Sequence, residues 1–269
     1  MPDTRSRRPV GGDNRRAARG LAVAIVIVAV AYSVNVWFNH TAIGLGLKSH
    51  GHAYVIGFFF AIGVILPALF LGWVASIGWA TPRRLGARLG WRDVGATAGA
   101  LIVGSLLAAA PLAPLMREPS ARAEAHRLFA LLLVASTAEV LIFLGALGNA
   151  VQLATAGLGR WRSGLMTVVA SSLAYGFFHL TYPAPWNTIP KCLFLSVMWL
   201  LVALVFLLSR SLLAAVAINN VMALIGFLQN RLDLPGTATA GWLRAAVAVA
   251  LFAAVFGVSQ RRSRRAGAP

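Results

Sequence analysis

Apolar residues fill most of the chain in long runs, which short polar segments separate. Eight runs can be placed, at 20–38, 53–78, 94–115, 127–149, 164–181, 190–209, 211–229 and 238–259. Each run is close to the ~20 residues that a helix needs to cross the hydrocarbon core of a bilayer. The pattern therefore predicts an all-α protein, a polytopic membrane helical bundle of about eight transmembrane helices.

The amino-acid composition agrees with membrane insertion. Of the 269 residues, 59% are hydrophobic, and the mean hydropathy of +0.76 is far above that of a soluble domain. The net charge of +17 would suggest a nucleic-acid partner in a soluble protein. Here the arginines lie in short loops and tails between apolar runs. We therefore exclude nucleic acid and expect these segments to face the lipid bilayer surface.

The placement of the arginines also predicts an orientation. Several precede Gly20, and most of the others fall in loops on the same side of the bilayer if all eight runs cross it. Cytoplasmic segments carry an excess of Lys and Arg, so we expect an integral plasma (inner) membrane protein with both termini in the cytoplasm. Cys192 is the only cysteine, so no intramolecular disulfide and no cysteine zinc site can form.

Four polar residues lie inside the predicted spans and are candidates for chemistry. Glu139 is the one acidic residue within a long apolar run, and His179, Asn219 and Asn220 follow in later runs. A carboxylate inside a membrane is rare and usually functional because its insertion costs at least a few kcal/mol, ~2.5–3.5 on translocon scales. The depths of Glu139, His179 and Asn220 along their helices are compatible with one intramembrane site.

Each of these residues also has a purely structural interpretation. Glu139 could be a protonated carboxyl group that joins helices by hydrogen bonds. His179 could form a helix–helix hydrogen bond, and the two asparagines could do the same.

Two segments carry motifs that suggest a family. The segment Glu139–Gly145, E-V-L-I-F-L-G, resembles the first motif, E-E-x-x-F-R-G, of the CPBP family of intramembrane metalloproteases. This family comprises the CAAX-processing and bacteriocin-processing proteases, also called Abi proteins. The segment Ser171–Leu180 resembles the second motif, an aromatic residue followed four residues later by His, with Tyr175 and His179 in those places.

A third segment completes the resemblance. Ser211–Asn220 is similar to the motif H-x-x-x-N, with Asn220 as the Asn. We accordingly divide the chain into a basic cytoplasmic tail (1–19), N-terminal transmembrane helices (20–126), a CPBP-like core with the polar site (127–229), a last transmembrane helix (230–260) and a second basic tail (261–269).

Three motif positions depart from the family pattern. The second Glu and the Arg of the first motif are Val140 and Leu144, and the His of the third motif is Val216. Val140 and Leu144 are spaced i, i+4 and share a helix face. In the family, Glu and Arg at these two positions would form a buried ion pair. Replacing both members of such a pair by apolar residues can be neutral or stabilising, so the two changes together are structurally consistent. Val216 can neither bind a metal nor donate a hydrogen bond.

The resemblance implies hydrolysis of a peptide bond in a membrane-associated protein or peptide. Glu139 would be the general base that activates water, and His179 and Asn220 would act as metal ligands or stabilise the oxyanion. The implied cofactor is a divalent metal such as zinc, with Glu139 and His179 as candidate ligands, although three residues including an Asn make a poor zinc site.

Three hypotheses remain open from the sequence. The first is a CPBP-type membrane endopeptidase. The second is a catalytically inactive relative that binds a membrane protein or peptide in the same cavity. The third is a small transporter or proton relay that uses Glu139 and His179. The loss of the third-motif His at Val216 favours the second, whereas a retained Glu139 favours the first or the third.

Overall fold

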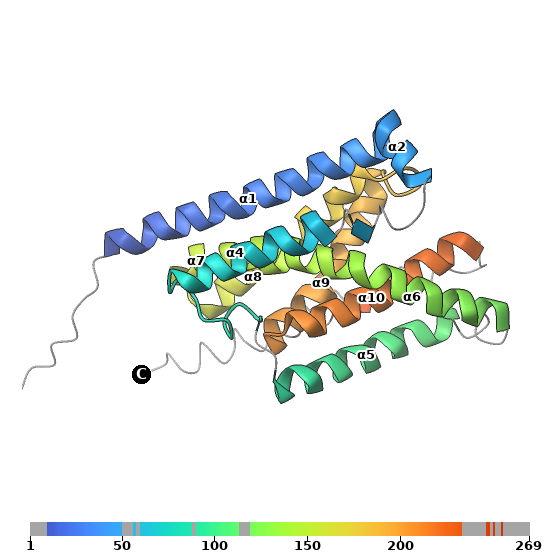
Figure 1. Ribbon diagram of the computed structural model, residues 1–269. Helices are drawn as coiled ribbons and strands as arrows, with labels where there is room; N and C mark the ends of the chain where they lie inside the picture. Colours follow the sequence, from blue (N-terminus) through green and yellow to red (C-terminus); the bar gives the residue numbers. More distant parts are fainter. Residues whose placement is uncertain are drawn as a thin grey trace, which may run out of the picture.

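The computed structural model describes residues 10–49, 60–87, 90–112 and 119–232, and a few positions at 56–57, 246–247, 250 and 254. Helices account for the regular structure of these residues, and no strand occurs among them (Figure 1). The all-α prediction is therefore confirmed for the described part of the chain.

Helices of very different length make up the first half. They are α1 (Val10–His40), α2 (Ala42–Ser49), the π-helix η1 (Ala61–Ile65), α4 (Leu66–Ser76) and α5 (Trp91–Leu112). The long helix α1 begins at Val10, inside the segment that we predicted to be a tail. Arginine is a good helix former, so the helix extends through the basic residues that precede the apolar run.

The second half contains the helices that carry the candidate motifs. They are α6 (Pro119–Val140), the π-helix η3 (Leu141–Gly148), α7 (Asn149–Ala154), the 3₁₀ turn η4 (Ala156–Leu158), α8 (Arg160–Phe178), the 3₁₀ turn η5 (His179–Thr181), α9 (Ile189–Ser209) and α10 (Leu212–Leu232). The helix α6 begins eight residues before the predicted boundary at 127, with a proline in its first turn, where the missing N–H costs nothing.

Four helices among the described residues, rather than the eight expected, are long and apolar enough to cross a membrane. They cover Arg15–His40, Arg122–Ala154, Arg160–Thr181 and Ile189–Ser209, and two shorter apolar helices cover Ala61–Ser76 and Leu212–Leu228. In the predicted run 53–78, the helical elements η1 and α4 begin at Ala61. The helix of run 94–115, α5, begins at Trp91 and carries the charged residues Arg92 and Asp93 in its first turn. Most of the run 238–259 lies outside the described residues.

Two apolar clusters hold the bundle together. The larger one includes Phe143, Trp199 and Phe206 and joins α1, α4 and η3 to α8, α9 and α10. The smaller one joins α6 to α10. At Gly176 the helices α8 and α9 are so close that a Cβ would lie 2.4 Å from the carbonyl oxygen of Cys192. Small residues at membrane helix crossings allow such approach.

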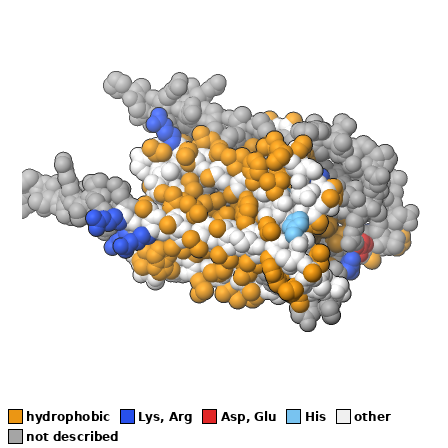
Figure 2. All heavy atoms as spheres, turned by 90° about the horizontal axis from the view of Figure 1, so that it is seen from above, with side chains coloured by type: hydrophobic (Ala, Val, Ile, Leu, Met, Phe, Trp, Pro, Cys, Tyr) orange, Lys and Arg blue, Asp and Glu red, His pale blue; other side chains and the backbone are white. Residues whose placement is uncertain are grey.

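The outer surface is also largely apolar. Figure 2 shows hydrophobic side chains over much of the face that it presents. Examples from α4 and α5 are Leu69 and Leu106, the latter 71% exposed. Such exposed apolar area is typical of helices that contact lipid, so the described part is that of an integral membrane protein.

Candidate functional site

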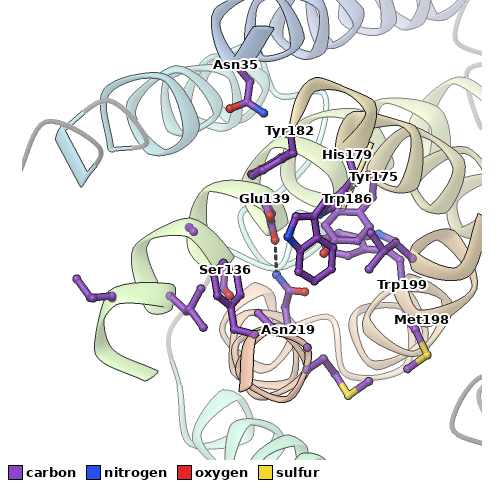
Figure 3. A pocket seen from close by; sticks show the side chains of 18 of the residues that line it. Asn35, Ser136, Glu139, Tyr175, His179, Tyr182, Trp186, Met198, Trp199 and Asn219 are labelled. Atoms are coloured by element: carbon purple, nitrogen blue, oxygen red, sulfur yellow. Dashed lines mark hydrogen bonds between the residues drawn. The ribbon is translucent and has the colours of Figure 1, made fainter. Parts of the chain in front are cut away.

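A cavity of about 480 Å³ lies between α1, α6, α8, α9 and α10. Its wall is mainly apolar and aromatic, with a few polar groups that converge on it. These polar groups include Glu139, Asn219, His179 and Tyr182. A mostly apolar pocket with a few convergent polar groups is the usual form of a ligand or active site. Figure 3 shows Glu139 near the middle of this group.

The geometry of α6 places Glu139 in this cavity. Glu139 is the second-last residue of α6, and the chain continues directly into the π-helix η3. Short π-helical segments inside helices occur frequently at functional sites. The carboxylate is only 7% exposed, and its Oε2 accepts a hydrogen bond of 2.9 Å from Asn219 Nδ2. The Tyr175 phenol also forms a hydrogen bond with this carboxylate. A carboxylate has about four acceptor sites, so it retains capacity for a further donor such as water.

His179 reaches the same cavity from the end of α8. Its Nδ1 lies 3.0 Å from the carbonyl oxygen of Tyr175, one turn earlier. A carbonyl can only accept, so Nδ1 carries the hydrogen, and in the neutral ring Nε2 is then an acceptor. A neutral His179 therefore offers a lone pair at Nε2 and cannot donate to an oxyanion, which was one of the two roles expected from the resemblance.

Aromatic rings fix the orientation of His179. Tyr182 stacks on the imidazole with 5.0 Å between ring centroids and 16° between planes. Tyr175 contacts the same imidazole edge-on and stacks on Trp199 at 3.8 Å. Burial, followed by the nearby carboxylate of Glu139, raises the pKa of the Tyr182 phenol well above its ordinary value. The Tyr182 hydroxyl therefore stays protonated and remains able to donate.

Asn220 points to a different place from Asn219. Its Oδ1 accepts a hydrogen bond of 3.3 Å from Ser136 Oγ, and its Nδ2 donates at 3.0 Å to the carbonyl oxygen of Phe129. Asn220 is 0% exposed and is not among the residues that line the cavity. The structure thus brings Glu139 and His179 to one cavity together with Asn219, and it places Asn220 in the contact between α6 and α10.

Asn35 and Asn39 on α1 were missed from the sequence. Asn35 Nδ2 donates to Thr181 Oγ1 at 2.6 Å, and Asn39 Nδ2 donates to the carbonyl oxygen of Thr181 at 3.0 Å. Both asparagines line the cavity. Their i, i+4 spacing within an apolar helix places them on one face, a signal that could have identified them. They fix α1 to the residues that follow His179.

The described residues of this cavity do not fit a resident zinc ion. No group of three His, Cys, Asp or Glu side chains that could hold a metal occurs within the described ranges. Val216, at the expected His position, is 6% exposed and belongs to the apolar core. Glu139 and His179 supply two ligands, whereas catalytic zinc takes three protein ligands.

The other two departures from the motif lie in the apolar core. Val140 and Leu144 are both 0% exposed and belong to the larger apolar cluster. Both positions therefore hold apolar side chains in apolar surroundings, and neither leaves an unpaired buried charge.

Comparisons with known proteins identify no relative of this chain. No protein-family model, no curated protein and no solved structure matches the chain. The resemblance to the CPBP family accordingly rests on the three motif segments alone.

Proposed function

We propose that this protein is an intramembrane hydrolase that cleaves a peptide bond in a membrane-associated protein or peptide. The observation that carries the proposal is that the Glu139 carboxylate and the Nε2 lone pair of His179 belong to one cavity. As part of this proposal, the protein lies in the plasma (inner) membrane with both termini in the cytoplasm.

Two acceptors in one cavity suit the activation of water. A water molecule that donates one proton to Glu139 and the other to His179 Nε2 directs its lone pairs toward a substrate carbonyl. Asn219 holds Oε2 of Glu139 in place by its 2.9 Å hydrogen bond. As the water oxygen attacks the carbonyl carbon, Glu139 takes its proton and later transfers it to the leaving nitrogen.

The oxyanion of this reaction needs a donor, and His179 is not one in its neutral form. In the proposal, the protonated hydroxyl of Tyr182 takes that role. It stacks on His179 and lines the cavity. The scheme uses no metal, because Glu139 and His179 supply only two candidate ligands in the cavity. Losing one oxyanion donor typically costs about 10²–10³ in rate, so Tyr182→Phe, which retains the ring and its stacking, should lower cleavage by a factor of that order.

The test compares the N-terminal peptides of membrane-fraction proteins, by mass spectrometry, from cells with wild-type protein, Glu139→Gln or Glu124→Gln. Glu124→Gln is a matched control because it removes a partly exposed carboxylate that lies on the same helix and does not line the cavity. We expect protein-dependent termini in wild type and in Glu124→Gln that vanish in Glu139→Gln. Identical profiles at equal abundance of folded protein would refute hydrolysis.

A second candidate function is binding without catalysis. The absence of a three-ligand set within the described ranges and the apolar Val216 favour it. In that case the cavity holds a membrane peptide, and photo-crosslinking from a residue of the cavity wall, such as Phe227, captures the same peptide intact in wild type and in Glu139→Gln. A captured peptide that is intact only in Glu139→Gln supports hydrolysis.

A further inference from the structure

A second hollow lies at the opposite end of α8 from His179. Its volume is about 1140 Å³, and it lies between the loop after α4, the start of α5, the α7–α8 junction and the α9–α10 junction. The 19 residues of α8 separate it from the cavity by ~28 Å at 1.5 Å per residue. Among the described residues, its lining holds one carboxylate, that of Asp93, and five arginines: Arg83, Arg84, Arg92, Arg160 and Arg210. We call it the basic hollow.

Hydrogen bonds from buried groups fix its floor. Asn149 Nδ2 donates to the carbonyl oxygen of Leu85 at 3.0 Å, and the backbone N–H of Leu212 donates to the carbonyl oxygen of Gly86 at 3.1 Å. Gly86 has a φ of +73°, and a Cβ there would lie 2.7 Å from the ring of Phe206. The loop that carries Arg83 and Arg84 is therefore anchored on the bundle.

The wall formed by α7 and α8 is also built from paired groups. Ser163 Oγ donates to the carbonyl oxygen of Gln152 at 2.8 Å, and Thr155 Oγ1 donates to Ser163 Oγ at 2.9 Å. Arg210, at the end of α9, donates to the side-chain oxygen of Gln152. The basic hollow is thus a defined structure, with one arginine fixed into its wall.

The electrostatics of the basic hollow favour an anion. Partial burial, followed by repulsion from Arg160 and Arg84, lowers the pKa of Arg210. The helix α8 begins here, and its N-cap residue, Gly159, makes no side-chain cap hydrogen bond. A helix N-terminus presents backbone N–H groups and the positive end of the helix dipole, which together bind phosphate well.

The arginine excess of cytoplasmic loops explains basic residues at this end of the helices, but not their convergence. Arg162 is exposed on the first turn of α8 and does not line the basic hollow, whereas Arg160, two residues earlier, does. Trp91, 90% exposed, stands in the lining as well. Tryptophan is enriched at the level of lipid headgroups. With Trp91 at that level, the hollow can be reached from the lipid and from the aqueous phase.

We propose that the basic hollow is a phosphate-binding site, for the phosphodiester headgroup of an anionic phospholipid or for a phosphate group on a soluble molecule. Arginine suits both because its guanidinium forms paired hydrogen bonds with phosphate oxygens. The site is independent of the proposed hydrolysis, since its residues and those of the cavity are different.

The test measures thermal unfolding of the full-length protein in detergent at constant ionic strength. Cys192 is the one cysteine and is buried, so a thiol-reactive dye reports unfolding. Phosphatidylglycerol, phosphatidylcholine and inorganic phosphate are titrated in turn. The variant Arg84→Gln/Arg160→Gln removes two exposed arginines of the hollow, and the control Arg16→Gln/Arg162→Gln removes two exposed arginines outside it.

Stabilisation by phosphatidylglycerol but not by phosphatidylcholine or inorganic phosphate identifies a lipid site, and stabilisation by inorganic phosphate identifies a soluble ligand. At ~1 kcal/mol per arginine, the hollow variant should bind about 30-fold more weakly, and the control should bind like wild type. The proposal is overturned if neither phosphatidylglycerol nor inorganic phosphate stabilises the wild-type protein. It is also overturned if both double variants lose the same amount of binding. Arg92→Gln provides a further lining variant if the first double variant fails to fold.

Discussion

The hydrogen bond between Asn219 and Glu139 provides a quantitative test of the site. It joins two helices, α10 and α6, and both partners are buried, at 2% and 7% exposure. A neutral hydrogen bond contributes about 0.5–1.5 kcal/mol, and one to a charged group about 1.5–3 kcal/mol. Side-chain hydrogen bonds between membrane helices average about 0.6 kcal/mol and reach about 1.7 kcal/mol.

The substitution Asn219→Leu keeps the approximate shape of the side chain and removes the donor. It leaves a buried carboxylate oxygen without this partner, so we expect a loss of about 2 kcal/mol, which is about a 30-fold change in the unfolding equilibrium constant. Glu139→Gln retains a side-chain oxygen that can accept from Asn219 Nδ2, so its stability should lie within about 0.5 kcal/mol of wild type.

A double-mutant cycle separates this bond from other effects. Glu139→Leu should cost about as much as Asn219→Leu, because it leaves the amide unpaired. The double variant should cost much less than the sum, because it replaces both partners by apolar groups. The assay is equilibrium unfolding by SDS titration in mixed micelles. Additive losses in the double variant would show that the two side chains do not depend on each other, and would refute the geometry of the site.

Three further predictions concern packing and the remaining polar residues. Gly176→Ala should destabilise the protein by about 1–3 kcal/mol in thermal unfolding, because the added Cβ overpacks α8 on α9. The control Gly72→Ala adds a Cβ that meets nothing within 4 Å, so it should be neutral or stabilising in the same measurement. Asn220→Leu should cost about 1 kcal/mol in SDS titration through its lost interhelical bonds and leave the N-terminal peptide profile unchanged, since Asn220 does not line the cavity. Asn35→Leu should cost about 1 kcal/mol by leaving Thr181 without its 2.6 Å partner, and an unchanged midpoint in SDS titration would contradict that pairing.

The apolar pattern predicted the helical class and the membrane environment well, because both depend on composition over whole runs. The number of crossings was less predictable. The charged residues Arg92 and Asp93 lie in the first turn of α5, just before the run 94–115, and in run 53–78 the helical elements η1 and α4 begin at Ala61. Among the described residues, the runs 20–38, 127–149, 164–181 and 190–209 lie in helices that are long and apolar enough to cross a membrane.

Glu139 and His179 could be selected from the sequence because a polar residue inside an apolar run is conspicuous on its own. For α10 the motif resemblance selected Asn220, whereas Asn219 is the asparagine of this helix that lines the cavity. Neighbouring residues on a helix point about 100° apart, so only one of them can face a given cavity. Which one does so depends on the rotation of α10 against α6, where Ser136 and the carbonyl of Phe129 engage Asn220. That rotation is a property of packing and not of any local pattern.

The orientation of α10 also bears on the missing histidine. The motif places His four residues before Asn. If Asn220 is the motif Asn, the His position is Val216; if Asn219 is the motif Asn, it is Ala215. Both residues are buried members of the apolar core. In neither register does α10 bring an imidazole to the cavity; its contribution there is the Asn219 amide, which is already engaged with Glu139. The proposed hydrolysis therefore draws its base from Glu139 and His179, which line the cavity, and its oxyanion donor from the Tyr182 hydroxyl rather than from α10.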